Sequence, residues 1–385
     1  MSSVLARMAT WFPVVSLTGP RQSGKSTLIR SVFADYEYLN LENPDVRTSA
    51  VEDPVGFIRR RPPRLIIDEA QYAPQLFSMI QVVADERGDV GQYVLSGSQN
   101  FLLLKGIQQS LAGRVGMLKL LPLSYAEAAS NKMIMGSLDV FALTGGYPRI
   151  YDTGMPRELF FQNYLATYVE RDVGGFLDVR NLSSFRAGLS LCAAGVGGLL
   201  NYTRLASDLG VSLTTVKSWL SILESSYLVF LLPPYASNVR KRLTKTPKLY
   251  FYDTGLLCYL LGITSERQLL DHPLRGQIIE NLVVSERAKA HLNQGREPAL
   301  FFYRDDSKRE IDLLDYTDAS SPLAIEIKSG ETYRDTFARH LCPVGDELGI
   351  PAGRRMVVYG GTEHYDARGV TVMPATTFLS EESGL

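Results

Sequence analysis

A glycine-rich loop separates a β-branched apolar run, Val14–Thr18, from a helical segment, Leu28–Phe33. The loop residues are Gly19, Pro20, Arg21, Gln22, Ser23, Gly24, Lys25, Ser26 and Thr27, which match the pattern GxxxxGK[ST] at every position. In this pattern the backbone N–H groups of the loop and of the next helix surround phosphate oxygens, and glycine allows the close approach. A chance glycine turn would not put strand, loop and helix in this order, so the loop predicts a nucleotide-binding α/β sheet.

The N-terminal third of the chain continues this alternation of β-rich and helical stretches. The β-rich runs are Val14–Gly19, Tyr36–Leu41, Arg64–Asp68, Gln92–Gly97 and Val115–Leu120. Apolar β-branched runs between helical segments are typical of a parallel sheet that is covered on both faces. The predicted fold class is therefore α/β, with a P-loop NTPase sheet between two layers of helices.

Composition limits the remaining choices. At roughly 150 residues per domain, 385 residues indicate two or three domains. The 40 Lys and Arg and 41 Asp and Glu leave a net charge of −1, which excludes a chain that coats nucleic acid throughout but not a local basic patch. Three scattered cysteines predict no disulfide framework and a reducing, cytoplasmic setting. The apolar runs are shorter than the about 20 residues that cross a bilayer, so we expect no membrane association.

Changes of pattern divide the chain into four expected segments. The sheet occupies 1–124, a mostly helical, lid-like region 125–200, a winged-helix-like segment 201–260, and a second α/β unit 261–385. The last unit is expected to contain a helix over Arg275–Leu292 and strands over Ala299–Tyr303, Glu310–Leu314, Leu323–Lys328, Arg355–Tyr359 and Gly369–Val372.

The residues of the loop and of the run Arg64–Asp68 predict ATP hydrolysis with Mg²⁺. Lys25 would reach the β- and γ-phosphates, and the Ser26 hydroxyl would join the Mg²⁺ shell. Asp68 ends a buried strand and suits Mg²⁺ binding through water, while Glu69 points differently and suits a general base for the attacking water. An Asp-Glu pair alone would be an ordinary strand-end turn, but its distance from the loop favours the catalytic interpretation.

Two further positions complete this hypothesis, each with an alternative. Ser96 or Ser98, after the fourth run, could sense the γ-phosphate, or these polar groups could cap the next helix. Arg114 precedes the fifth run and could stabilise transition-state charge, in cis or from a second subunit of a homo-oligomer, or it could be a surface arginine.

The segment Thr203–Leu223 predicts a helix, a turn at Gly210 and a second helix, as in a helix-turn-helix unit. Thr214, Thr215, Lys217 and Ser218 would be exposed on the second helix. Residues 201–250 contain seven Lys and Arg and two Asp and Glu, a local charge of +5, and include a basic run over Arg240–Lys248. The unit could contact DNA, or it could pack against protein with a solvated basic loop.

A second group of charged residues follows in the C-terminal unit. Glu280 lies on the expected helix, Asp312 on one strand, and Glu326 with Lys328 on one face of the next strand. Three carboxylates could bind one or two Mg²⁺ ions and activate water against a phosphodiester, with Lys328 stabilising charge. The alternative is a strand with alternating surface charges, or a nuclease-like fold whose residues have structural duties.

Motifs along nearly the whole chain resemble those of a widespread prokaryotic family of AAA-like or STAND P-loop ATPases. They are Gly19–Thr27, Leu65–Gln71, Gly97–Gln99, Ala112–Val115, Leu121–Tyr125, Thr144–Pro148, Tyr168–Asp172, Lys248–Leu257 and Ile325–Lys328. The resemblance implies ATP binding and hydrolysis, a winged-helix segment and a C-terminal domain of the PD-(D/E)xK nuclease fold. The chain departs from that nuclease pattern because Glu280 is the first acidic position and no Pro-Asp precedes the Asp312 strand.

The main functional hypothesis is therefore a Mg²⁺-dependent ATPase that acts on or near DNA, with the C-terminal domain as a nuclease or its descendant. The alternative is a nucleotide-gated switch that recruits a protein partner and has no nuclease activity.

Overall fold

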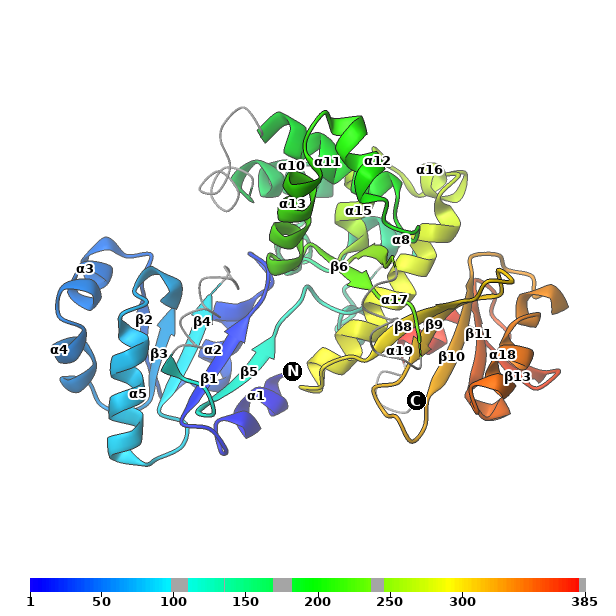
Figure 1. Cartoon of the computed structure of the whole chain (residues 1–385). Helices are drawn as coiled ribbons and strands as arrows, with labels where there is room; N and C mark the ends of the chain where they lie inside the picture. The colour runs from blue at the N-terminus through cyan, green and yellow to red at the C-terminus, as the bar shows by residue number, and fades with distance from the viewer. Residues whose placement is uncertain (98–109, 135, 169–181, 237–245, 381–385) are drawn as a thin grey trace. The chain divides into compact units, whose positions relative to one another are not determined.

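The computed structural model describes residues 1–97, 110–134, 136–168, 182–236 and 246–380 of the chain (Figure 1). These residues separate into two units. The first unit comprises Met1–Pro122 with the short pieces Ser225–Tyr227 and Leu292–Gly295. The second comprises Leu123–Glu224, Leu228–His291 and Arg296–Leu385.

The first unit is built on a parallel five-stranded sheet in the order β2-β3-β4-β1-β5. Its strands are β1 Val14–Thr18, β2 Glu37–Asn40, β3 Leu65–Asp68, β4 Tyr93–Gly97 and β5 Val115–Lys119. Each strand agrees with a predicted run to within one residue, because these apolar runs end at polar or glycine-rich turns. The predicted parallel α/β sheet is confirmed.

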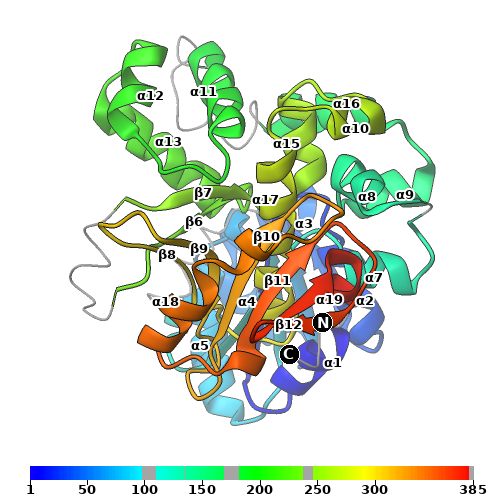
Figure 2. The same cartoon turned by 90° about the vertical axis from the view of Figure 1, so that its right-hand side faces the viewer.

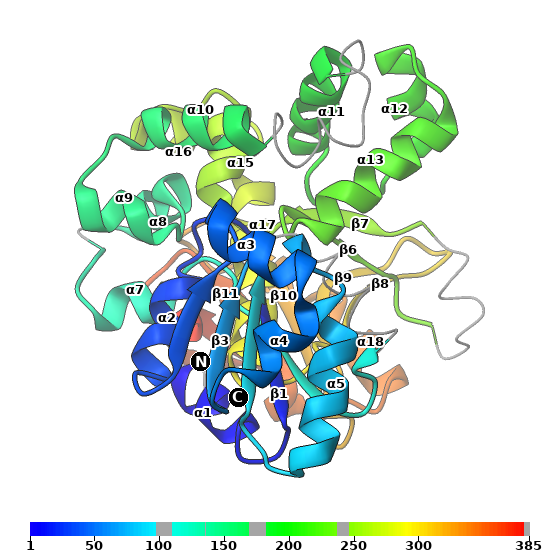
Figure 3. The same ribbon diagram turned by 90° about the vertical axis from the view of Figure 1, so that its left-hand side faces the viewer.

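Helices cover both faces of this sheet (Figure 3). On one face, α1 (Ser2–Met8) and α2 (Lys25–Val32) pack against Val15, Leu17 and the other members of one apolar cluster. On the opposite face, α4 (Pro54–Arg59) and α5 (Leu76–Arg87) pack against Ile67, Leu95 and a second cluster. Alternate residues of each strand thus enter different clusters, as the two-residue period of a strand requires. The other helices described in this unit are α3 (Pro44–Glu52) and the 3₁₀ turn η1 (Ala70–Tyr72).

The second unit begins with the expected helical region. Its helices are α7 Tyr125–Ser130, α8 Leu138–Thr144, α9 Pro148–Thr153, α10 Arg157–Tyr168 and α11 Leu182–Ala194. Next come α12 (Tyr202–Leu209) and α13 (Leu213–Ser225), which Gly210 separates with a φ of 63°. Strands β6 (Val229–Leu232) and β7 (Lys248–Phe251) then form an antiparallel pair.

The C-terminal part of this unit contains a mixed six-stranded sheet in the order β12-β13-β11-β10-β9-β8 (Figure 2). The strands are β8 Leu300–Arg304, β9 Glu310–Asp315, β10 Leu323–Lys328, β11 Arg355–Tyr359, β12 Tyr365–Ala367 and β13 Val370–Pro374. The short strand β12 was not predicted, since three mostly exposed residues carry no apolar pattern. One face packs against α18 (Leu341–Glu347) and the other against α17 (Arg275–Asn293) and α19 (Ala375–Ser380). Helices α15 (Thr254–Leu260) and α16 (Glu266–Leu270), and the 3₁₀ turns η4 (Asp335–Ala338) and η5 (Ala352–Arg354), complete the described elements.

Asp253 explains why two of the motif segments belong together. Its buried carboxylate accepts hydrogen bonds from the N–H of Leu256, at 2.8 Å, and from the N–H of Gly146, at 2.7 Å. The first bond caps α15, and the second holds the glycine turn between α8 and α9. A Cβ on Gly145 would lie 2.4 Å from Oδ1 of Asp253, so that position admits only glycine. Burial raises the pKa of Asp253, and these N–H donors and Lys289 oppose the rise. The motif residues around Gly145 and Asp253 therefore stabilise the fold.

We expect Asp253→Ala to lower the unfolding temperature, because it leaves two buried N–H groups without an acceptor, at a cost of about 1–3 kcal/mol each. Asp253→Asn keeps one acceptor oxygen and should lose less. Thermal unfolding followed by circular dichroism measures both, with the exposed Asp152→Ala as the matched control. An Asp253→Ala protein as stable as the control would contradict this role.

Candidate functional site

The glycine-rich loop has the backbone shape that phosphate binding requires. Gly24 ends the loop in the left-handed region, with a φ of 93°, and α2 begins at the next residue, Lys25. At the other end Gly19 has a φ of 153°, and a Cβ there would lie 2.0 Å from the carbonyl oxygen of Leu120. Only glycine fits this contact. The loop thus leads directly into the N-terminus of α2, which is the positive end of the helix dipole.

Lys25 is folded back into the loop. Its Nζ donates to the carbonyl oxygens of Gly19, at 3.0 Å, and Pro20, at 2.7 Å, and the side chain is buried. The hydroxyl of Ser23 also donates to the Pro20 carbonyl, at 3.0 Å. The ammonium group is therefore held inside the curve of the loop, where a phosphate group would compete with these carbonyls for it.

Asp68 is the meeting point of four segments of the first unit. Its Oδ2 accepts hydrogen bonds from the Ser26 hydroxyl, at 2.6 Å, and from the Tyr38 hydroxyl, at 2.5 Å. Its Oδ1 accepts from the Ser96 hydroxyl and from the N–H of Glu69, the latter at 3.1 Å. The structure thus brings Ser26 and Asp68 together, as the sequence predicted.

Tyr38 was not predicted as part of the site. Burial and its bond to Asp68 raise the pKa of Tyr38 well above the usual range, so the phenol stays protonated and donates. The guanidinium of Arg30 lies 5.0 Å from the centre of the Tyr38 ring. No motif marks this tyrosine. The strand register could have identified Tyr38. It pairs with Ile66 in the parallel sheet, two residues before Asn40, which pairs with Asp68.

Glu69 follows in an unusual backbone conformation, with a φ of 55°. The side-chain amide of Gln71 donates to its Oε2. The backbone therefore leaves the strand conformation at Glu69, directly after Asp68. Gln71 is a second position that the sequence did not single out, although it ends the predicted motif Leu65–Gln71.

Of the remaining predicted positions of this site, Ser96 contacts Asp68 and Arg114 lies elsewhere. Ser96 donates to Asp68, whereas Ser98 lies outside the described residues. Arg114 immediately precedes β5, at the amino edge of the parallel sheet, and its carbonyl accepts from Val14 at the start of β1. Its guanidinium pairs with Asp85, at 2.6 Å. The carboxyl edge carries Asp68, so the position of Arg114 does not support a role in cis, and a role in trans stays a prediction.

The predicted residues of the C-terminal unit also converge. Lys328 contacts Glu326 at 2.7 Å and Asp312 at 3.5 Å, and the N–H of Ile327 donates to Asp312 at 2.8 Å. Burial and the charge of Asp312 raise the pKa of Glu280 to about 7 and that of Glu326 to about 8.

Two side chains that were not predicted take part. Lys248 contacts Glu280 at 3.2 Å and Glu310 at 2.7 Å. Burial lowers the pKa of Lys248, but nearby carboxylates, Glu280 first, outweigh it and raise the pKa above the usual value. We call Glu280, Glu310, Asp312 and Glu326 the carboxylate cluster. In the part of the chain that the structure describes, no three His, Cys, Asp or Glu side chains are arranged to hold a metal ion.

The helix-turn-helix segment has the predicted exposed face. Val216, Trp219 and Leu220 are buried, whereas Thr214, Lys217 and Ser218 are exposed and Thr215 is half-buried. Most of the basic run, including Arg240, Lys241 and Arg242, lies outside the described residues.

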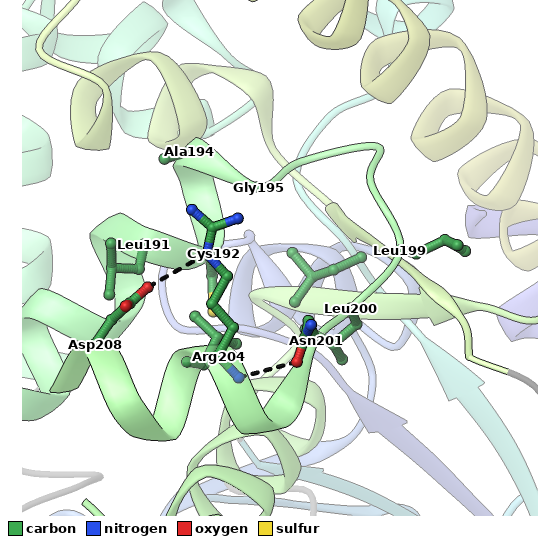
Figure 4. A pocket seen from close by; sticks show the side chains of 11 residues that line it. Leu191, Cys192, Ala194, Gly195, Leu199, Leu200, Asn201, Arg204 and Asp208 are labelled. Carbon is green, nitrogen blue, oxygen red and sulfur yellow. Dashed lines mark hydrogen bonds and ion pairs between the residues drawn. The ribbon is translucent and has the colours of Figure 1, made fainter. Parts of the chain in front are cut away.

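Figure 4 shows a cavity of about 260 Å³ beside α11 and α12. Leucines form much of its wall, and Arg204, which pairs with Asp208 at 3.7 Å, is its cationic side chain. The N–H of Arg204 donates to Asn201, which caps α12. No residue of the nucleotide loop or of the carboxylate cluster lines this cavity.

Among the described helices, none is long and apolar enough to cross a membrane.

Three families match successive parts of the chain. Residues 12–129 match the family described as AAA domain, and this range contains the glycine-rich loop and Asp68. Residues 135–267 match a domain of unknown function (DUF8612), and residues 275–378 match another (DUF4143).

Relatives and solved structures extend these matches. An uncharacterized protein of Mycobacterium tuberculosis (Rv2008c) is 31% identical over 378 residues, which cover 96% of this chain and 82% of the relative, and an uncharacterized protein of Mycobacterium bovis (Mb2031c) matches equally. A Walker-type ATPase of Pyrococcus abyssi aligns with 68% of this chain and 94% of its own, with a TM-score of 0.44 and 14% identity. At that TM-score the likeness carries no inference. The chain therefore belongs to the same family as these mycobacterial proteins, and its N-terminal part is an AAA domain of the P-loop ATPase type.

Proposed function

We propose that this protein binds ATP with Mg²⁺ and hydrolyses it to ADP and phosphate at the loop Gly19–Thr27. The observation that carries the proposal is the 2.6 Å hydrogen bond between Ser26, at the start of α2, and Asp68, at the end of β3. The match of residues 12–129 to the AAA domain family supports the same conclusion.

The residues present fit a magnesium ion. Ser26 and Asp68 offer hydroxyl and carboxylate oxygens, which are the donors that Mg²⁺ prefers, and they lie next to the phosphate-binding loop. The bound ion would neutralise charge on the β- and γ-phosphates. Ser26 would bind the ion directly, and Asp68 would hold its water molecules.

The protein groups then have distinct tasks. Lys25 exchanges the carbonyls of Gly19 and Pro20 for phosphate oxygens, and the N–H groups at the start of α2 hold the same phosphates. Glu69 accepts a proton from water as the water oxygen bonds to the γ-phosphorus and the bond to the β–γ bridging oxygen breaks. Gln71 orients Glu69 through its amide.

Two substitutions separate binding from hydrolysis. Lys25→Ala should abolish ATP turnover and weaken ATP binding, because the loop loses its cation. Glu69→Gln should keep ATP binding but lower turnover by about 10²–10⁴-fold, the usual contribution of a general base. Binding of a fluorescent ATP analogue and phosphate release measure the two effects. Unchanged turnover in Lys25→Ala would exclude this site. ATP binding without turnover in the wild type would favour the alternative, a nucleotide-gated switch for a protein partner.

We expect Tyr38 to act on Mg²⁺ binding by positioning Asp68. Tyr38→Phe removes one hydrogen bond to a charged group, worth about 1.5 kcal/mol, and should raise the Mg²⁺ concentration for half-maximal ATP binding about tenfold. Affinity for ATP without Mg²⁺ should stay the same. Tyr36→Phe is the matched control, because its hydroxyl donates to the Gly91 carbonyl and not to Asp68. Equal Mg²⁺ dependence in the two variants would contradict the role of Tyr38.

A second proposal is that α13 contacts DNA. The observation that favours it is the exposed surface of Thr214, Lys217 and Ser218 on the second helix of a helix-turn-helix pair. Its core residues are buried on the opposite side, as a helix that lies on DNA requires.

Charge reversal tests this contact. Lys217→Glu should weaken binding to DNA of any sequence and lower the slope of log affinity against log salt by about 1, because one phosphate contact is lost. Fluorescence anisotropy over a salt series measures both quantities. The control is Arg267→Glu, an exposed position on α16. If both variants bind alike, or if the wild type shows no salt-dependent binding, α13 is not a DNA contact.

A further inference from the structure

Lys248 is a buried cation at the centre of the carboxylate cluster. It begins β7, and only 4% of its surface is exposed. Its Nζ lies 2.7 Å from Oε1 of Glu310 on β9 and 3.2 Å from Oε1 of Glu280 on α17. The Tyr250 hydroxyl, two residues along the same strand, donates to the same Glu280 oxygen at 2.5 Å. Alternate residues of β7 therefore both bind this cluster.

Backbone contacts hold β7 in this place. The side chain of Asn281 on α17 accepts from the N–H of Phe251, at 2.7 Å, and donates to its carbonyl, at 2.9 Å. On the other side the N–H of Gly197 donates to the Leu249 carbonyl, at 3.0 Å, and the N–H of Leu200 donates to the Pro247 carbonyl, at 2.9 Å. Because these bonds hold the backbone of β7, the Cα of Lys248 stays beside the carboxylates.

The other two carboxylates of the cluster are also paired with a lysine. Lys328 contacts Glu326 and Asp312, so both lysines together face all four carboxylates. A nuclease-like domain implies a divalent metal at Glu280, Asp312 and Glu326, but these residues do not fit one. Such an ion would compete with the ammonium groups for Oε1 of Glu280, Oδ2 of Asp312 and Oε1 of Glu326. At that range the like charges would repel strongly.

We propose that Lys248 is the resident cation of the carboxylate cluster, in place of a divalent metal ion, and that it links the antiparallel pair β6–β7 to α17 and β9. A buried ammonium is costly unless it is paired, and the carboxylates of Glu280 and Glu310 supply that pairing. The cluster is thus an internal ion-pair network that does not catalyse metal-dependent cleavage. This inference is independent of ATP turnover.

Manganese binding tests the proposal, measured by calorimetry without nucleotide. The parent carries Asp68→Asn, so that the nucleotide site takes up no metal. The parent and the parent with the added Glu326→Gln substitution should therefore bind the same amount of Mn²⁺. Lys248→Met keeps the length of the side chain but not its charge. It should lower the unfolding temperature and create one Mn²⁺ site at the carboxylates that Lys248 pairs, which Glu280→Gln then abolishes. Lys248→Arg, which keeps the charge, should bind no Mn²⁺.

Two results would overturn the proposal. One is a Mn²⁺ site in the parent that Glu326→Gln removes, which would make the cluster a metal centre. The other is a folded Lys248→Met protein that gains no Mn²⁺ site, because the charge of Lys248 would then not exclude the metal. If Lys248→Met fails to fold, the comparison of the parent with its Glu326→Gln variant still decides whether a metal is resident.

Discussion

The carboxylate of Asp68 ties the nucleotide loop to the sheet. Hydroxyl groups from α2, β2 and β4 and one N–H of its own turn all donate to it. The carboxyl ends of parallel strands lie at the same edge of the sheet, so polar residues at the ends of β3 and β4 come close together there. The hydrogen bond from Ser26 connects the first turn of α2 to the end of β3. A single buried acceptor thus sets the geometry of the whole candidate site.

The second unit depends on buried charge in a different way. Helix α17 is buried over most of its length and yet carries Glu286, Arg287, Lys289 and His291. Each has a partner: Lys289 pairs with Glu286, at 2.7 Å, and Arg287 and His291 both contact Asp315, at 2.6 Å. Such pairs add little net stability, but removing one partner leaves a costly unpaired charge. They therefore restrict how the strands and loops around α17 can pack.

Local patterns predicted the fold well and the site in part. Strands β1 to β5 and the turn at Gly24 follow from short runs of residues whose geometry is local. Lys248 was predicted as part of a basic run and of a family motif, but not as a partner of the carboxylates, because Glu280 and Glu310 lie 32 and 62 positions away along the chain. The role of Arg114 depended on which edge of the sheet it occupies, and its place before β5 became clear only with the strand register.

The two groups of carboxylates differ in what neutralises them. Asp68 is surrounded by hydroxyl and N–H donors, which carry no net charge, so its negative charge is still available to a cation that arrives with a nucleotide. Glu280, Glu310, Asp312 and Glu326 face the ammonium groups of Lys248 and Lys328, so their cations are already part of the chain. Acidic residues on neighbouring strands therefore do not by themselves predict a metal site. The charge of their hydrogen-bond donors distinguishes a site prepared for a metal ion from one that the fold has filled.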